Sequence, residues 1–470
     1  MKPVQPTAGD TSWFTHDRFG LFIHWGLYAL AARHEWVQCH ELIDPAEYED
    51  RYFRRFDPDL YDPDRWAELA ANAGMKYFVI TTKHHEGFCL WDSKHTDYKA
   101  TRTPAKRDLL RPMVDAFRRR GLRTGFYHSL IDWHHPHYVV DYVTHPLRNA
   151  LPPFDPADGK RPNLRNNDFA RYREGVDVNA GRDQSKYADY LHAQVRELLT
   201  EFDPVDILWF DFSYVRNPGA GRTDFTWNKG REAWRSEQLL ELVRELAPNV
   251  ILNDRLDLPH DHPGYRDVKT PEQYQPTQWV EVDGKPVVWE ACQTFSGSWG
   301  YFRDEETWRS TRQLVFTLID CASKGGNLLL NVGPTGRGEF DHRAVERLEG
   351  IGQWMRHHAP AIHGCTQAPE GFKSPDHARL TYHPGKRKLY VHLMQWPYKH
   401  LVLRGRAFLE QVDFARLMHD GSEVQVTRHV NGDNPDGYTT FNPGDDALIV
   451  NLPQKQPPGV EIPVVELDLK

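Results

Sequence analysis

Carboxylates that could take part in covalent or acid–base chemistry follow several apolar segments of this chain. Asp211 ends the run VDILWFD, with Trp209 and Phe212 close to it in the sequence. A carboxylate beside aromatic rings suits the stabilisation of a sugar oxocarbenium ion. A strand-end aspartate can equally cap the segment that follows, so Asp211 alone does not decide the chemistry.

Four glutamates are candidate partners for Asp211. Glu272 lies in the proline-bracketed segment VKTPEQYQP, and Glu290 ends the run VVWE. The other two are Glu35, in ARHEWVQ, and Glu86. Each has an ordinary alternative: Glu272 could be a surface residue, and Glu290 a buried structural carboxylate. Two carboxyl groups flanking a glycosidic bond would make a hydrolase.

Histidines form the second candidate group. His24 lies in LFIHWG, His84 and His85 follow the apolar run KYFVITTK, and His128 precedes Ser129. Neighbouring side chains on a strand point to opposite faces, so His84 and His85 could share a metal ion only where the backbone bends. The H-E-x-x-H zinc motif is absent from the sequence. We therefore expect these histidines to bind ligand hydroxyls, with a metal-dependent hydrolase as the alternative.

Helix and strand patterns alternate around these residues. Amphipathic helices are predicted at 64–74, 107–121, 185–202 and 236–249, and strands at 76–83, 122–129, 205–212 and 250–255. The polar residues His84, His128, Asp211 and Arg255 lie at the ends of these strands. Active sites of (β/α) barrels form at that end, and the sequence contains no G-x-G-x-x-G turn of a doubly wound sheet. The pattern predicts an α/β fold with a (β/α)8-like (TIM) barrel.

The pattern changes after about residue 362. The helix predicted at 343–359 ends the catalytic domain, residues 1–360, and ARLTYHPGKRKLYVHLMQ then predicts two strands joined by a turn. We expect a C-terminal β-sandwich domain over 361–470. Residues 134–184 predict a long loop near the active-site face.

Composition excludes several classes of protein. The net charge is −8 without long like-charge blocks, which argues against nucleic-acid and membrane partners. The five cysteines are scattered, which argues against a disulfide framework or a structural zinc site. No segment predicts a signal peptide or a membrane span, so a cytoplasmic location is the default, with secretion or a periplasmic location if a signal peptide has been removed. The sequence leaves a homo-oligomer open.

Several motifs of the barrel region together resemble one known family. They are RFGLFIHWGLYA, HEW, KYFVITTKHHEGFCLWDSK, GFYHSLIDWHHP, ILWFDF, WEACQTFSGSWGY and SKGGNLLLNVGPTGRG. Their order and sequence resemble the α-L-fucosidases of glycoside hydrolase family 29 over roughly residues 13–360. The resemblance implies an exo-acting, retaining hydrolase of terminal α-L-fucose in fucosylated oligosaccharides or glycoconjugates. It also implies an irregular barrel, a C-terminal sandwich, and neither a metal nor an organic cofactor.

The resemblance assigns the catalytic roles. Asp211 matches the family's nucleophile, which forms a covalent fucosyl-enzyme ester. The acid/base varies within the family: Glu272 matches one version and is our first choice, and Glu290 matches another and is the second. Retaining glycosidases hold the two carboxyl groups about 5–5.5 Å apart.

The resemblance also assigns the sugar contacts. Residues that would bind or flank the fucose ring are His24, Glu35, Trp36, His84, His85, Tyr127, His128 and Arg255. Phe22, Trp209 and Trp299 would line an apolar pocket for the fucose methyl group. The chain departs from many relatives at His128, where they have a second tyrosine. A fucose-binding barrel without catalysis is the alternative function.

Overall fold

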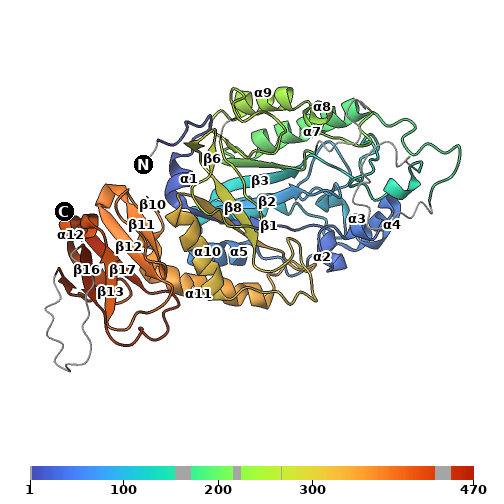
Figure 1. Cartoon of the computed structure of the whole chain (residues 1–470). Helices are drawn as coiled ribbons and strands as arrows, with labels where there is room; N and C mark the ends of the chain where they lie inside the picture. The colour runs from blue at the N-terminus through green and yellow to red at the C-terminus, as the bar shows by residue number, and fades with distance from the viewer. Residues whose placement is uncertain (1–2, 154–170, 215–223, 266, 429–445) are drawn as a thin grey trace.

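A parallel sheet forms the centre of the larger domain (Figure 1). The computed structural model describes residues 3–153, 171–214, 224–265, 267–428 and 446–470. The strands, in their order across the sheet, are β5 (Ile251–Leu252), β4 (Ile207–Asp211), β3 (Arg123–Ser129), β2 (Tyr77–Lys83), β1 (Phe19–Ile23), β9 (Asn327–Val332) and β8 (Glu290–Thr294). All neighbouring pairs are parallel, so the carboxyl ends of the strands meet on one side.

An irregular segment at 268–273 closes this sheet into a barrel. On one side the amide of Val268 donates to Leu252 O at 3.2 Å, next to β5. On the other side the amide of Cys292, in β8, donates to Pro271 O at 3.0 Å. Glu272 and Cys292 form a parallel bridge. The closing segment contains a proline, and the short antiparallel pair β6 (Glu281–Val282) and β7 (Lys285–Pro286) connects it to β8 instead of a helix.

Helices cover the outside of the barrel. They are α5 (Pro63–Asn72), α6 (Leu110–Arg119), α7 (Gln184–Glu201), α9 (Ser236–Leu246), α10 (Thr311–Ser323) and α11 (His342–His358). Capping residues determine where these helices begin and end. At the start of α10, the Ser310 hydroxyl and the Gln313 side chain form a capping box. Gly74, which follows α5, has φ +83°, a conformation that glycine adopts without strain.

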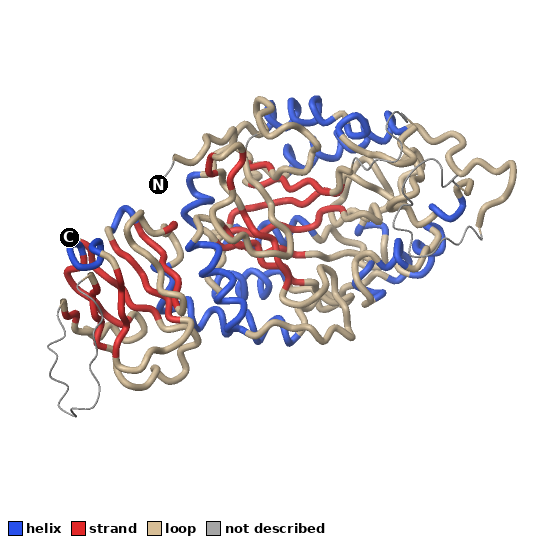
Figure 2. The backbone as a smooth tube through the Cα atoms, in the orientation of Figure 1, coloured by secondary structure: helices blue, strands red, loops and turns tan. Residues whose placement is uncertain are grey.

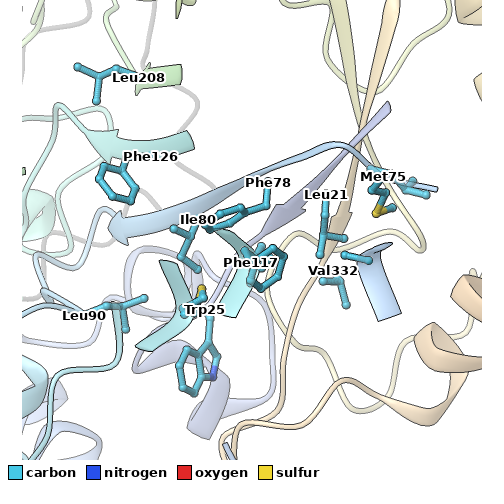
Figure 3. Close-up of a cluster of buried hydrophobic side chains, with 14 of the residues drawn as sticks. Leu21, Trp25, Met75, Phe78, Ile80, Leu90, Phe117, Phe126, Leu208 and Val332 are labelled. Atoms are coloured by element: carbon cyan, nitrogen blue, oxygen red, sulfur yellow. The ribbon is translucent and has the colours of Figure 1, made fainter. Parts of the chain in front are cut away.

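The space between strands and helices is filled by large apolar side chains (Figure 3). Phe78 of β2 packs against Phe117 of α6 with ring centroids 4.2 Å apart. Met75, Ile80 and Leu208 belong to the same buried cluster. Burying each such side chain contributes about 1.5–3 kcal/mol, so this layer fixes the strands whose ends carry the polar residues.

A smaller domain of antiparallel strands follows the barrel (Figure 2). One sheet holds β10 (Thr366–Gln367), β11 (Ala378–His383), β12 (Lys388–Leu393), β17 (Val464–Leu469) and β14 (Val412–Leu417). The other holds β13 (His400–Arg404), β16 (Ala447–Asn451) and β15 (Val426–Thr427). A separate apolar cluster that includes Leu389, Leu401 and Leu448 joins the two sheets.

Hydrogen bonds and ion pairs fix this domain to the last helices of the barrel. Trp354 of α11 donates its indole N–H to Ile462 O at 2.8 Å, and Arg379 pairs with Asp320 of α10 at 2.9 Å. Both contacts are remote from the carboxyl ends of the barrel strands, so the sandwich supports the barrel from outside.

The predicted barrel followed by a β-sandwich is confirmed. The four predicted helix-then-strand units correspond to α5–β2, α6–β3, α7–β4 and α9–β5. The predicted long loop 134–184 includes 154–170, which lie outside the described residues. Its described part contains the short helix η3 (Arg148–Ala150).

Candidate active site

A cavity opens at the carboxyl ends of the barrel strands. Fourteen residues line it: Phe22, His24, Glu35, Trp36, His84, His85, Tyr127, Trp209, Asp211, Phe212, Arg255, Glu272, Cys292 and Trp299. They come from segments spread over most of the barrel sequence, which the parallel sheet brings to one edge. This is the edge at which barrel enzymes place their active sites.

Asp211 is the last residue of β4, and two donors hold its carboxylate. The Tyr127 hydroxyl donates to Oδ2 and the Arg255 guanidinium to Oδ1, each at 2.9 Å. Burial and the neighbouring carboxylate raise the pKa of Tyr127 well above its usual value, so its hydroxyl keeps its proton and remains a donor. Asp211 is therefore an oriented, largely enclosed carboxylate.

Glu272 projects from the closing segment 268–273 on the other side of Arg255. The Arg255 Nη2 donates to Glu272 Oε2 at 2.7 Å while Nη1 donates to Asp211. One planar guanidinium thus bridges both carboxylates and fixes their separation. The Arg255 guanidinium also lies 4.5 Å from the Trp209 ring, a cation–π contact that restricts its position.

His84 and His85 both line the cavity, because β2 ends at Lys83 and the chain bends after it. Their ring centroids lie 4.0 Å apart. The bend that would let both side chains face one site is therefore present, and neither histidine belongs to the strand. Burial and the neighbouring His84 hold the pKa values of His24 and His85 well below the usual range. These two imidazoles are neutral near pH 7 and suited to bind hydroxyl groups.

Glu35 and Trp36 form another part of the wall. Glu35 Oε2 accepts the Gly300 amide at 2.8 Å. Within the described chain, Glu35 Oε1 has no hydrogen-bond donor. His34 Nδ1, 3.3 Å from it, itself accepts the Trp36 amide. A buried carboxylate oxygen that faces a cavity without a donor is an acceptor for a ligand hydroxyl.

Aromatic rings form the remaining wall. Phe22 lies at the centre, with its ring 5.4 Å from Trp209, 5.9 Å from Trp299 and 6.0 Å from Tyr127. Tyr127 and Trp209 are stacked with centroids 5.5 Å apart. The cavity therefore combines one apolar wall with a ring of hydroxyl-binding groups, an arrangement that suits a deoxy sugar.

Sequence comparison gives the family of this barrel. A family profile described as "Alpha-L-fucosidase" matches residues 5–360.

The chain belongs to the α-L-fucosidase family, glycoside hydrolase family 29.

Relatives and solved structures agree with this assignment. The plasma α-L-fucosidase of Rattus norvegicus is 29% identical, over 94% of this chain and 87% of its own length. The structure of α-L-fucosidase isoenzyme 1 from Paenibacillus thiaminolyticus is similar with a TM-score of 0.82 and 40% identity, over 98% of each chain. A family 29 fucosidase from Bacteroides thetaiotaomicron, trapped as a covalent intermediate with a 2-fluoro-fucosyl fluoride, is 25% identical with a TM-score of 0.76. The chain is thus a glycoside hydrolase of the α-L-fucosidase type.

Two residues expected in the fucosidase site do not line the cavity. Glu290 is the first residue of β8, where it pairs with Asn327 at the start of β9, so it lies at the opposite end of the barrel from Asp211. It is fully buried and accepts the Tyr77 hydroxyl at 2.5 Å. Glu290, the second choice for the acid/base, is therefore away from this cavity, because the run VVW precedes the strand rather than forming it.

His128 is the second expected site residue that does not line the cavity. Its side chain is completely buried against Thr82, with Nδ1 3.0 Å from the Thr82 hydroxyl. It projects away from the cavity because it neighbours Tyr127, whose side chain projects into it. The departure from many relatives at this position does not alter the wall of the sugar pocket.

Two cavity residues were not among the predicted site residues. Phe212 has φ +80° and packs its ring 5.1 Å from Trp36 and 5.3 Å from His85. A non-glycine residue in the left-handed region is a common mark of a functional site, but the sequence alone does not show it. Cys292 is buried beside the carboxylates, and burial raises the pKa of its thiol well above the usual value. Its position in the cavity follows from the parallel bridge between Cys292 and Glu272, which the sequence alone does not show.

The alternative of a metal-dependent hydrolase would require a cluster of metal ligands. Among the described residues, no three His, Cys, Asp or Glu side chains converge as they would around a metal ion. In the same part of the chain, no helix is long and apolar enough to cross a membrane.

Proposed function

We propose that this enzyme is an exo-acting, retaining α-L-fucosidase that uses Asp211 as nucleophile and Glu272 as general acid/base. The observation that carries the proposal is the pair of carboxylates bridged by Arg255 at the mouth of the cavity. Bridging by a single guanidinium is compatible with the separation of about 5–5.5 Å that a retaining mechanism needs. The covalent intermediate trapped in the Bacteroides relative supports the same mechanism.

The reaction follows in two displacements. Asp211 attacks the anomeric carbon, and Glu272 gives its proton to the departing glycosidic oxygen, leaving a fucosyl ester on Asp211. Glu272, now a carboxylate, takes a proton from water, whose oxygen attacks the same carbon and releases fucose and Asp211. The second step restores both groups to their starting forms.

The cavity supports removal of a single terminal sugar. Its aromatic wall and buried hydroxyl-binding groups suit one terminal sugar, which implies exo action on fucosylated oligosaccharides or glycoconjugates. The fucose methyl group would lie against Phe22, Trp209 and Trp299. Burying one methyl there is worth on the order of 1 kcal/mol, a several-fold preference over the sugar that lacks it.

The Asp211→Gly variant tests the nucleophile. It should lower turnover of an aryl α-L-fucoside by several orders of magnitude, and azide should restore part of the rate by occupying the space of the missing carboxylate. Product analysis should then show a fucosyl azide. Near-normal turnover of Asp211→Gly without azide would refute the assignment.

The Glu272→Ala variant tests the acid/base. Its loss of rate should be small for a leaving group of low pKa and large for a natural oligosaccharide, since only the latter needs protonation. The matched control is Glu290→Gln, which changes a buried carboxyl group at the other end of the barrel. If Glu290→Gln shows the leaving-group dependence and Glu272→Ala does not, the two roles have been assigned wrongly.

A further inference from the structure

The hydroxyl group of Ser129 lies between His85 and a backbone carbonyl, and it is completely buried at the end of β3. Its Oγ is 2.7 Å from Ile131 O and 2.7 Å from His85 Nδ1. A carbonyl oxygen can only accept, so the single hydroxyl proton of Ser129 is donated to Ile131 O. At His85 the same hydroxyl must therefore accept, and Nδ1 carries the imidazole proton.

The other nitrogen of His85 is then an acceptor beside the nucleophile. The imidazole is neutral, because burial and the neighbouring His84 hold the pKa of His85 well below its usual value. Nε2 therefore has a lone pair and no proton, and it lies 3.8 Å from Asp211 Oδ2.

We infer that Ser129 is a positioning residue that fixes the tautomer of His85, so that Nε2 accepts a hydroxyl group of the substrate. The inference rests on the proposed role of Asp211. The hydroxyl nearest to the carbon that Asp211 attacks is the one on the adjacent ring carbon, C2, so this hydroxyl is the donor to Nε2.

His24 shows the same arrangement with different residues. Asn331 donates from Nδ2 to Trp299 O at 2.7 Å, which turns its Oδ1 toward His24 Nδ1 at 2.6 Å. Nδ1 of His24 therefore carries the proton, and its Nε2 is also an acceptor. Two cavity histidines that follow different strands thus have their tautomers fixed in the same sense, which favours a role in substrate binding over coincidence.

The chain also contains a matched control. Thr82 donates its hydroxyl to Tyr127 O at 2.8 Å and accepts from His128 Nδ1 at 3.0 Å, so it repeats the contacts of Ser129 on the neighbouring strand. His128 does not line the cavity. Thr82→Val therefore removes an equivalent buried hydroxyl beside a histidine that does not contact substrate, and in the site only the main-chain carbonyl of Tyr127 loses a donor.

The first experiment measures the tautomer directly. Nitrogen-15 NMR of the wild-type protein, labelled at histidine, should show the His85 proton on Nδ1, with the resonance identified by its absence in His85→Asn. In Ser129→Ala, population of the Nε2–H form should increase. A wild-type His85 protonated on Nε2 would overturn the inference, and this result does not depend on the fucosidase activity.

The second experiment measures kinetics on two substrates. Ser129→Ala should lower kcat/KM about tenfold on an aryl α-L-fucoside but no more than about twofold on its 2-deoxy analogue, which lacks the donor hydroxyl. Thr82→Val should leave the ratio between the substrates unchanged. Equal losses on both substrates in Ser129→Ala would mean that the hydroxyl only supports the fold. A wild-type enzyme inactive on both would refute the proposed function instead.

Discussion

Replacing Glu290 by glutamine should stabilise the enzyme at neutral pH without impairing catalysis. Burial raises the pKa of Glu290 from 4.5 to about 8, and the hydrogen bond from Tyr77 offsets only part of this. The folded protein therefore keeps the carboxyl proton at pH values where the unfolded chain has lost it. For an acid whose pKa is raised by folding, stability falls as pH rises from the unfolded to the folded pKa.

The size of the effect follows from the two pKa values. Each pH unit between about 4.5 and about 8 costs ~1.4 kcal/mol. At pH 7 the wild-type protein loses ~3 kcal/mol in this way, and at pH 5 less than ~1 kcal/mol. Glutamine cannot ionise, and its carbonyl oxygen can accept the Tyr77 hydroxyl as the protonated acid does.

Urea unfolding at pH 5 and pH 7 provides the assay. The free energy of unfolding of Glu290→Gln minus that of the wild type should increase by ~2 kcal/mol between the two pH values. All other titrating groups are shared, so their contributions cancel in this comparison. Glu272→Gln is the control: its carboxylate is 39% exposed, so it should lose activity with little change in stability. An equal pH dependence of Glu290→Gln and wild type would refute the reasoning.

Three further changes test the site and its support. Arg255→Lys should lower kcat/KM on an aryl α-L-fucoside ~10- to 100-fold, because one ammonium group cannot bridge both carboxylates in the same plane; a loss below twofold would contradict this. Trp299→Ala should reduce the preference for fucose over the pentose that lacks the methyl group by roughly fourfold, measured as the ratio of kcat/KM values. Lys229→Met should destabilise the protein by ~3–5 kcal/mol in urea unfolding, because it leaves the buried Asp141 without its cation, and adding Asp141→Asn should recover part of this loss.

The sequence predicts the strands that consist of long apolar runs. It also predicts which residues directly follow those strands. Asp211 lies where its apolar segment places it, whereas His128, the polar residue expected at the end of the preceding strand, faces away from the cavity, and Tyr127 was assigned through the family resemblance. His84 and His85 were assigned to the cavity through the family resemblance, whereas strand periodicity alone would have separated them. The alternation rule does not apply to them, because β2 ends at Lys83, as the apolar run KYFVITTK predicts, and both histidines follow it.

Glu290 shows why an apolar run can misplace a strand. The residues Val287, Val288 and Trp289 are buried before β8 begins, while β8 itself contains Gln293 and Thr294. Buried polar side chains are tolerated where partners exist, as Arg309 provides for Gln293 and Gln273 for Thr294. Those partners are distant in sequence, so hydrophobicity alone could not locate the strand.

The irregular closure of the barrel explains how the two proposed catalytic carboxylates differ. Asp211 ends a regular strand, and its side chain is 14% exposed behind Tyr127 and Arg255. Glu272 projects from the proline-containing closing segment, and its side chain is 39% exposed. A nucleophile must meet only the anomeric carbon, whereas an acid/base must reach the leaving-group oxygen and then water. The more exposed carboxylate thus lies on the irregular segment 268–273, where it can meet both the leaving group and water, as the proposed acid/base must.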